Sequence, residues 1–286
     1  MEALNSSWRL TCGSRRPSGT EVSQRSHAAT AQPAASATKV AALASRVAVI
    51  SDIHANWHAL EAVLEAIEQE EPTELWCLGD VVGYGPRPNP CCAAMEQRAG
   101  LCLAGNHDLG VLGEIDLAEF TGDAVEAARW TRSVLAEGSR EYLESLRPTA
   151  RRQDVELFHA SPRDPVWDYV LTPEAAAAAL ELTEGPLVLV GHSHIPLAIA
   201  LQNGALEGGL APEGTKVDLS GGRFLLNPGS VGQPRDGDPR AAWLLLDFES
   251  RTASFRRVQY PVELTQAEIR ERGLPDALAE RLGHGL

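Results

Sequence analysis

Five of the eight histidines in this 286-residue chain fall in short polar blocks, most of which also carry aspartate or asparagine. In chain order, the blocks are Asp52-Ile53-His54, Gly79-Asp80, Gly105-Asn106-His107-Asp108, His159 and Gly191-His192-Ser193-His194. Each block stands where an apolar run ends and a glycine or turn begins. Carboxylate, amide and imidazole groups suit Mn, Fe, Zn or Ni rather than thiophilic metals. Together the blocks predict a metal site.

Taken one at a time, the blocks have ordinary structural interpretations. An Asp-x-His pair is often a helix N-cap followed by a surface histidine, and Gly-Asp or Gly-Asn-His-Asp occurs as a turn. A single histidine such as His159 is usually a hydrogen-bonded core residue. The metal site is favoured because all the blocks occur in one chain, each at the same kind of position.

The spacing within the blocks indicates how the side chains converge. Residues two apart on an extended strand end point the same way. Asp52 with His54, and His192 with His194, can therefore each face one site. Two neighbouring cations need a bridging carboxylate, and Asp80 is the natural candidate.

His107 is predicted to differ from the ligands around it. Neighbouring residues on an extended strand end diverge, so Asn106 and His107 should not both face one cation. Asp108 is the kind of carboxylate that keeps an imidazole charged. A charged imidazole donates a proton and does not bind a metal, so the sequence predicts a general acid at His107.

Strand and helix patterns alternate from residue 46 onward and place the blocks at strand ends. Strands are predicted at residues 46–50, 74–78, 101–104, 155–159, 187–190, 197–201, 224–226, 241–248 and 252–258. Helices are predicted at residues 57–68, 89–98, 173–182, twice within 114–147 with a break near Gly138, and from about 265. This order predicts an α/β fold of two packed sheets with helices outside and ligands at the carboxyl ends of the strands.

Composition limits the other classes of protein. No apolar run approaches the roughly 18 to 20 residues of a membrane helix. The net charge of −14 argues against non-specific nucleic-acid binding. Five cysteines without a CxxC pair argue against a disulfide framework or zinc ribbon and favour free thiols in a reducing compartment. We therefore expect a cytoplasmic protein that binds no membrane.

The first 45 residues differ from the rest. Five basic and two acidic residues stand in this Ser- and Ala-rich stretch, which leaves a net charge of −17 on residues 46–286. It lacks hydrophobic periodicity, so residues 1–45 are predicted to be a disordered tail and residues 46–286 the domain. A flexible tail or a start codon placed too early is favoured over a transit peptide.

The ordered blocks resemble the calcineurin-like metallophosphoesterase superfamily, and its bacterial branch of small phosphodiesterases in particular. Three stretches are similar to sequences of that branch: residues 79–90 (GDVVGYGPRPNP), 159–170 (HASPRDPVWDYV) and 227–237 (NPGSVGQPRDG). The resemblance covers about residues 46–286. It implies a four-layer α/β/β/α sandwich of two mixed sheets, with the metal site at the carboxyl ends of the strands.

The resemblance also implies a role for each residue of the blocks. Asp52, His54 and His194 would hold the first metal, Asn106, His159 and His192 the second, and Asp80 would bridge them. His107 would lie beside the leaving group, oriented by Asp108. The cofactors would be two divalent transition-metal ions, manganese first and Fe, Zn, Ni or Co otherwise.

One departure from the superfamily bears on the substrate. Its protein Ser/Thr phosphatases carry an Asp-Arg pair where this chain has Gly83-Tyr84. Arg87, Arg163 or Arg235 could contact phosphate instead, although each alone reads more simply as a surface arginine. The implied function is hydrolysis of small or nucleotide-derived phosphodiesters by a metal-bridging hydroxide. A phosphomonoesterase or a non-catalytic binding scaffold on the same fold are the alternatives, and the oligomeric state is left open.

Overall fold

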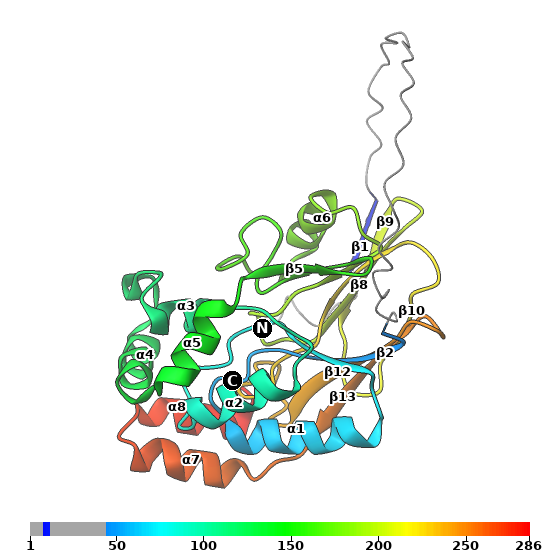
Figure 1. Ribbon diagram of the computed structural model, residues 1–286. Helices are drawn as coiled ribbons and strands as arrows, with labels where there is room; N and C mark the ends of the chain where they lie inside the picture. The colour runs from blue at the N-terminus through cyan, green and yellow to red at the C-terminus, as the bar shows by residue number, and fades with distance from the viewer. Residues whose placement is uncertain (1–7, 12–43) are drawn as a thin grey trace, which may run out of the picture.

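The computed structural model describes residues 8–11 and 44–286, which form two stacked sheets flanked by helices (Figure 1). In spatial order, the seven-stranded sheet consists of β1 (Trp8–Thr11), β9 (Ala205–Leu210), β8 (Leu197–Gln202), β11 (Arg223–Asn227), β7 (Leu187–Leu189), β6 (Val155–Phe158) and β5 (Thr149–Arg152). The six-stranded sheet consists of β10 (Lys216–Asp218), β13 (Thr252–Val258), β12 (Ala241–Asp247), β2 (Arg46–Ile50), β3 (Glu74–Cys77) and β4 (Leu101–Cys102). Each sheet contains parallel and antiparallel pairs, so both are mixed.

Helices cover the outer faces of the sheets. They are α1 (Trp57–Gln69), α2 (Pro88–Arg98), α3 (Asn106–Leu112), α4 (Gly122–Val134), α5 (Glu137–Ser145), α6 (Pro173–Glu181), α7 (Val262–Glu271) and α8 (Asp276–Glu280), with 3-10 turns η2 (Leu117–Glu119) and η3 (Arg281–His284). Leu180 of α6 packs with Leu225 of the seven-stranded sheet. A separate cluster, including Trp76 and Leu189, lies between the sheets. With α1 and α2 on the six-stranded sheet, these layers confirm the predicted α/β/β/α sandwich.

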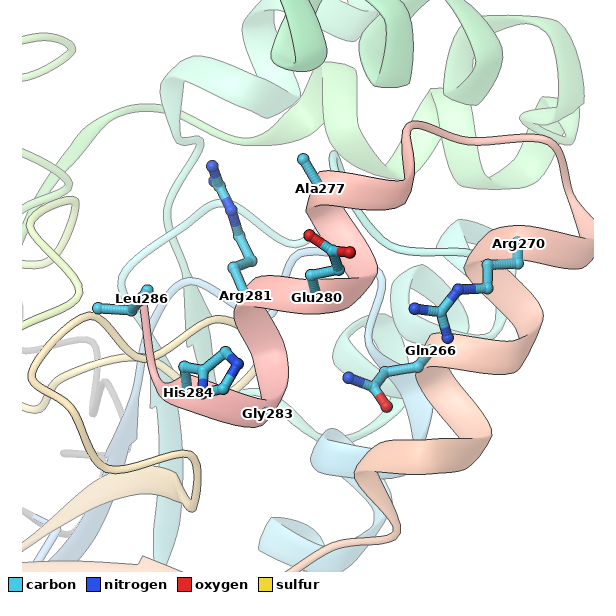
Figure 2. Close-up of a pocket in the computed structure, with 8 residues that line it drawn as sticks. All are labelled: Gln266, Arg270, Ala277, Glu280, Arg281, Gly283, His284 and Leu286. Atoms are coloured by element: carbon cyan, nitrogen blue, oxygen red, sulfur yellow. The ribbon is translucent and has the colours of Figure 1, made fainter.

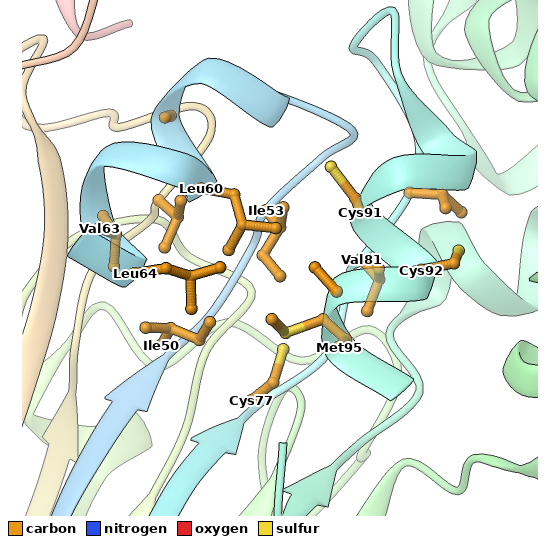
Figure 3. Packing of buried hydrophobic residues seen from close by; sticks show 14 of the residues in the cluster. Ile50, Ile53, Leu60, Val63, Leu64, Cys77, Val81, Cys91, Cys92 and Met95 are labelled. Atoms are coloured by element: carbon orange, nitrogen blue, oxygen red, sulfur yellow. The ribbon is translucent and has the colours of Figure 1, made fainter. Parts of the chain in front are cut away.

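The helical layer on the six-stranded sheet is held by the amphipathic face predicted for α1 (Figure 3). Leu60, Val63 and Leu64 are buried and belong to one cluster with Ile50 of β2 and Met95 of α2. Burying one such side chain completely stabilises the fold by about 1.5–3 kcal/mol. This packing fixes the strand ends from which the polar blocks leave.

Four cysteines of the described residues are free thiols. Cys77, Cys91 and Cys92 are buried in that same cluster, and Cys102 is half-buried beside Cys77 on the neighbouring strand. Cys12 lies outside the described residues. All four therefore pack as apolar side chains, and Cys91 and Cys92 do so from the first half of α2.

Parallel strands bring the polar blocks to one edge of the sandwich. β2, β3 and β4 run parallel in one sheet, and β6, β7 and β11 run parallel in the other. Asp52 and Asp80 follow β2 and β3, while His159 and His192 follow β6 and β7. Residues up to 140 positions apart in the chain thus meet where the carboxyl ends of the two sheets converge.

Some elements differ from the prediction. The sequence did not predict β5, β9 or β10, because β5 is a largely exposed polar run and β9 contains two glycines. Helices α4 and α5 separate at residues 135–136 rather than at Gly138, which lies in the first turn of α5. A Cβ on Gly138 would meet nothing within 4 Å, so the position is open to solvent and tolerates the helix. In residues 8–11 and 44–286, no helix is long and apolar enough to cross a membrane.

Part of the predicted tail forms an edge strand. Trp8–Thr11 (β1) pairs antiparallel with β9, a pairing that so short a run could not reveal in the sequence. The remaining tail residues up to position 43 lie outside the described residues. Ala44 is already buried in the cluster between the sheets. The domain boundary at residue 45 stays a prediction.

Deleting residues 1–43 is expected to leave turnover unchanged, because β1 lies at a sheet edge away from β6, β7 and β11. The loss of one short edge strand should cost no more than about 1 kcal/mol, a shift in melting temperature within about 4 °C. Calorimetry and a steady-state assay measure both quantities, and a deletion of residues 1–7 that keeps β1 is the control. A large loss of turnover would show that the segment is part of the site.

Candidate metal centre

Two groups of buried metal-binding side chains share one carboxylate at the strand ends. One comprises Asp52, His54, Asp80 and His194, and the other comprises Asp80, His159 and His192. Within each group the ligand atoms lie within 4.8 Å of one another. Since Asp80 belongs to both, the geometry matches two ion sites joined by a bridging carboxylate.

The backbone at these positions is not the extended strand end that the sequence suggested. Asp52, His54, Asp80, His192 and His194 all have left-handed backbone, with φ between 49° and 61°. Such conformations cost about 1–3 kcal/mol each in residues other than glycine and persist where the surroundings enforce them. The residues converge because the chain turns at these positions. The sequence analysis therefore identified the right residues, but the alternation of side chains along an extended strand is not what brings them together.

Backbone carbonyls orient three of the imidazoles. The Nδ1 atoms of His54, His159 and His194 lie 3.2, 2.9 and 2.6 Å from the carbonyl oxygens of Val82, Leu78 and Gln233 respectively. A carbonyl can only accept, so Nδ1 carries the hydrogen and Nε2 keeps its lone pair. All three rings therefore present the metal-binding nitrogen to the centre.

These lone pairs face other acceptors across short distances. His54 Nε2 lies 3.0 Å from His194 Nε2, and Asp80 Oδ2 lies 3.5 Å from His54 Nε2 and 3.6 Å from His159 Nε2. Asp80 Oδ2 and Asp52 Oδ1 are buried without a hydrogen-bond partner. Acceptors facing one another in a buried site repel unless a cation or a shared proton lies between them, and the donor set fits divalent metal ions.

Burial favours the uncharged form of both the carboxyl and the imidazole ligands. It raises the pKa of Asp52 to about 7 and raises the pKa of Asp80 well above its usual range, with a further rise from the Asp108 charge. Burial also lowers the pKa values of His54 and His194 well below their usual range. Neutral imidazoles are metal ligands, and a bound cation would restore ionised carboxylates.

Asn106 and His192 complete the second group. Asn106 Oδ1 lies 3.2 Å from His159 Nε2. The Nε2 atom of His192 is buried without a partner, and its ring is hydrogen-bonded to the Trp167 backbone. Asn106 begins helix α3 rather than ending a strand. The sequence did not predict this helix, because Gly105 and the glycine within α3 make the segment look like a turn. All seven predicted ligands thus lie together.

The predicted partnership of His107 and Asp108 is wrong in this structure. The Asp108 carboxylate accepts hydrogen bonds from the backbone N–H groups of Gly105 (2.9 Å), Val82 (3.0 Å) and Val81 (3.3 Å). Asp108 therefore ties two site loops together and does not hold the imidazole. An aspartate at the third position of a helix accepts from the N–H of the N-cap residue, here Gly105. The Val81 and Val82 N–H groups come from another loop, so nothing beside Asp108 in the sequence reveals them.

The His107 ring is instead held by packing. It lies 4.3 Å from the Tyr84 ring and 5.0 Å from the Phe120 ring, and its Nδ1 atom has no hydrogen-bond partner. Gly83 has a φ of 92°, and a Cβ there would lie 2.5 Å from His107 Nδ1. Burial lowers the pKa of His107 well below its usual range, which disfavours the predicted imidazolium. Neither metal-binding group in the described residues includes it.

A pocket of about 90 Å³ opens over Asp80, His192 and His194. Four aromatic side chains line it: Tyr84, Phe120, Trp167 and Tyr169. Tyr169 is 45% exposed, and its ring stacks on that of His192 with ring centres 4.2 Å apart. A ligand in this pocket would lie between the metal-binding side chains and an aromatic wall.

A larger pocket, of about 750 Å³, lies between α7 and the C-terminal segment (Figure 2). Its side chains include Arg270, Glu280, Arg281 and His284. None of them belongs to a metal-binding group of the described residues. We therefore place the chemistry in the smaller pocket.

Several supporting residues were not recognised in the sequence. Asn227 donates to the Gly191 carbonyl (2.8 Å) and the Ser193 hydroxyl (3.0 Å), and Ser230 donates to the Asp52 carbonyl (2.8 Å). Their signals in the sequence were their place at the end of the apolar run of β11 and within residues 227–237, the stretch that resembles the superfamily. Their contacts are with backbone or with a neighbouring hydroxyl, so residue type alone could not reveal the partners.

The sandwich with a buried, two-part group of metal ligands at its strand ends is that of a metal-dependent phosphoesterase. The chain belongs to the calcineurin-like phosphoesterase superfamily, whose domain model matches residues 46–251. It is 37% identical over 244 residues to an uncharacterised protein of Methanocaldococcus jannaschii, covering 83% of this chain and 97% of that one.

Solved structures support the same family and fold. A metallophosphoesterase from Sphaerobacter thermophilus is 39% identical with a TM-score of 0.77, covering 85% of this chain and all of that one. A hypothetical protein from Pyrococcus horikoshii has a TM-score of 0.71 at 23% identity, covering 84% of this chain and 98% of that one, and supports the fold.

Removing metal with a chelator is expected to lower the melting temperature, because buried acceptors then face one another without a cation. A ligand at a hundred times its Kd stabilises the folded state by about 2.7 kcal/mol, or about 5–10 °C for a domain of this size. Calorimetry before chelation, after it and after reloading with Mn²⁺ measures the effect. Asp80→Asn is expected to shrink the difference. No change on stripping and reloading would contradict a metal at this site.

Proposed function

We propose that this protein is a dinuclear metal-dependent phosphodiesterase acting on small or nucleotide-derived phosphodiesters. The observation that carries the proposal is the pair of ligand groups joined through Asp80 directly beneath an aromatic-lined pocket. Asp52, His54 and His194 would hold one ion, and Asn106, His159 and His192 the other. Manganese is the first choice among ions that accept this oxygen and imidazole set.

The residues around the two ions would have different roles in the reaction. Two bound cations would supply an activated water near neutral pH and neutralise charge on the phosphoryl oxygens. Asn106 contributes a neutral ligand, which leaves more of the positive charge for the substrate. His107 lines the pocket and would give a proton to the departing alkoxide, a contribution of about 10²–10⁴ in rate.

The aromatic wall supports a nucleotide-derived substrate. Nucleobases stack on aromatic side chains with about 1–3 kcal/mol per base. Tyr169 is 45% exposed, and Trp167 lies at the same pocket with its ring centre 5.1 Å from that of Phe120. A base attached to the scissile phosphate could therefore lie on this wall while the phosphate faces the ions.

A substrate panel tests the proposal. Metal-loaded protein is assayed on nitrophenyl mono- and diesters, cyclic nucleotides, dinucleoside phosphates and an alkyl diester without a base. We expect diesters to be cleaved with higher kcat/KM than their matched monoesters, and base-containing diesters faster than the alkyl diester. Faster monoester cleavage would assign a phosphomonoesterase. A fully loaded protein that cleaves nothing would assign a binding scaffold.

Tyr169→Ala is expected to lower kcat/KM for base-containing diesters by about 10- to 100-fold while changing the alkyl diester little, because stacking is lost only for the former. Tyr169→Phe keeps the ring and is the matched control. Metal content, measured in parallel, should be unchanged. An equal loss on both diesters would contradict base stacking at this wall.

We also propose that the protein works in the cytoplasm on a small phosphoester and binds neither membranes nor, non-specifically, nucleic acids. The free, buried thiols support a reducing compartment. The acidic charge supports the absence of non-specific nucleic-acid binding. Gel-shift titration with random-sequence DNA at low salt checks the second point, and binding there would contradict it.

A further inference from the structure

The three arginines that could contact phosphate have different surroundings. Arg87 pairs with Glu268, and Arg163 pairs with Asp168. Arg235 forms none of the ion pairs found among the described residues. Its guanidinium donates one hydrogen bond, to the side-chain oxygen of Gln233 at 2.9 Å. Arg235 lines the pocket over the metal-binding groups, which leaves most of its donors available there.

The loop that carries Arg235 is fixed to a ligand loop at two points. The Arg235 backbone N–H donates to the His194 carbonyl at 3.3 Å, and the Gln233 carbonyl accepts from His194 Nδ1 at 2.6 Å. Farther along, the Gly237 N–H donates to the Gly285 carbonyl at 3.0 Å. The position of the guanidinium is therefore coupled to the metal centre and to the C-terminal segment.

The Arg235 guanidinium lies over the ring of Tyr84. The guanidinium carbon lies 6.0 Å from the centre of the Tyr84 ring, at the limit of a cation–π contact. The same ring lies 4.7 Å from the His54 ring and 4.3 Å from the His107 ring. Tyr84 thus connects the side chain of Arg235 to the ligand His54 and to His107.

The charges around Arg235 point to an anion as its partner. A half-buried guanidinium normally has a carboxylate partner, and the nearby carboxylates Asp52 and Asp80 belong to the metal-binding groups. Guanidinium groups bind phosphate oxygens through two parallel hydrogen bonds. We propose that Arg235 is the phosphate-binding side chain of this site, gripping a non-bridging phosphoryl oxygen pair in place of the arginine missing after Gly83. This inference rests on the proposed function.

Calorimetric titration of metal-loaded protein with inorganic phosphate tests the inference without requiring turnover. We expect Arg235→Gln to weaken phosphate binding at least about 10-fold, as for the loss of charge-assisted hydrogen bonds, and Arg235→Lys to weaken it less. Arg98→Gln, which removes an exposed arginine paired with Glu68, is the matched control and should bind like the wild type. Metal content is measured for every variant.

The outcomes separate this inference from the proposed function. Wild-type binding that Arg235→Gln weakens, with metals retained, supports the inference even when no ester is hydrolysed; that result would sink only the proposed function. Phosphate binding unchanged in fully loaded Arg235→Gln overturns the inference while leaving hydrolysis untouched. Loss of metal from Arg235→Gln, or no phosphate binding by the loaded wild type, also overturns it.

Discussion

Asp80→Asn is expected to abolish the metal centre, whereas His159→Ala is expected to remove only one of two ions. Asp80 belongs to both ligand groups and His159 to one. Asparagine can still accept the His107 backbone N–H, which lies 2.9 Å from Asp80 Oδ1, so the loop should stay in place. Its amide nitrogen, placed where Oδ2 lies, cannot ligate a cation. Both variants should lose at least about 10³-fold in activity, the scale of losing an electrostatic stabiliser of the transition state.

Elemental analysis of protein purified without chelator measures the stoichiometry, and transition-metal reloading checks that the variants cannot recover it. The matched control is His58→Ala, which removes a histidine of α1 whose Nε2 lies 3.2 Å from Glu268, outside both groups. This variant should keep two ions per chain. Wild-type protein that neither contains nor takes up Mn, Fe, Zn, Ni or Co would refute the dinuclear centre altogether.

The sequence predicts the helices and strands well where their buried faces produce a periodic pattern of apolar residues. The helical face of α1 and the apolar runs of β2, β3, β6 and β7 are visible because each element packs one side, or both, into a core. Strand β5 is mostly exposed, and β9 carries Gly208 and Gly209, so neither has such a pattern. Pairing between strands, as between β1 and β9, depends on distant residues and leaves no local signal.

The site is predictable in its residues but less so in its geometry. The ligands were recognisable because metal-binding residue types recur at the ends of apolar runs. The left-handed backbone at Asp52 and His194, by contrast, depends on the surrounding structure. It is uncommon for residues other than glycine, although aspartate and histidine adopt it more often than most. Asp108 was assigned to His107 because they are neighbours in sequence, whereas its partners Val81 and Val82 lie in another loop. The aromatic wall was missed because it is assembled from three separate segments, which carry Tyr84, Phe120, and Trp167 with Tyr169.

His107→Asn is expected to retain both ions and to lose about 10²–10⁴ in rate on esters with poor leaving groups. Neither ligand group of the described residues includes His107, and its contact with Asp80 is made by the backbone, which the substitution keeps. Burial lowers the pKa of His107, and the negative charge of a bound phosphoester opposes that effect. Activated aryl esters need little protonation of the leaving group, so their hydrolysis should fall much less.

Asp108→Asn distinguishes a general acid from a residue that merely holds the loops. The Asp108 carboxylate accepts from three backbone N–H groups, and an amide oxygen can replace only part of that. We therefore expect Asp108→Asn to lower the melting temperature and to slow aryl and alkyl esters alike, without dependence on the leaving group. Steady-state kinetics on a series of diesters of graded leaving-group pKa measures the difference. If His107→Asn sheds its metals, or slows all members of the series equally, His107 is not the proton donor.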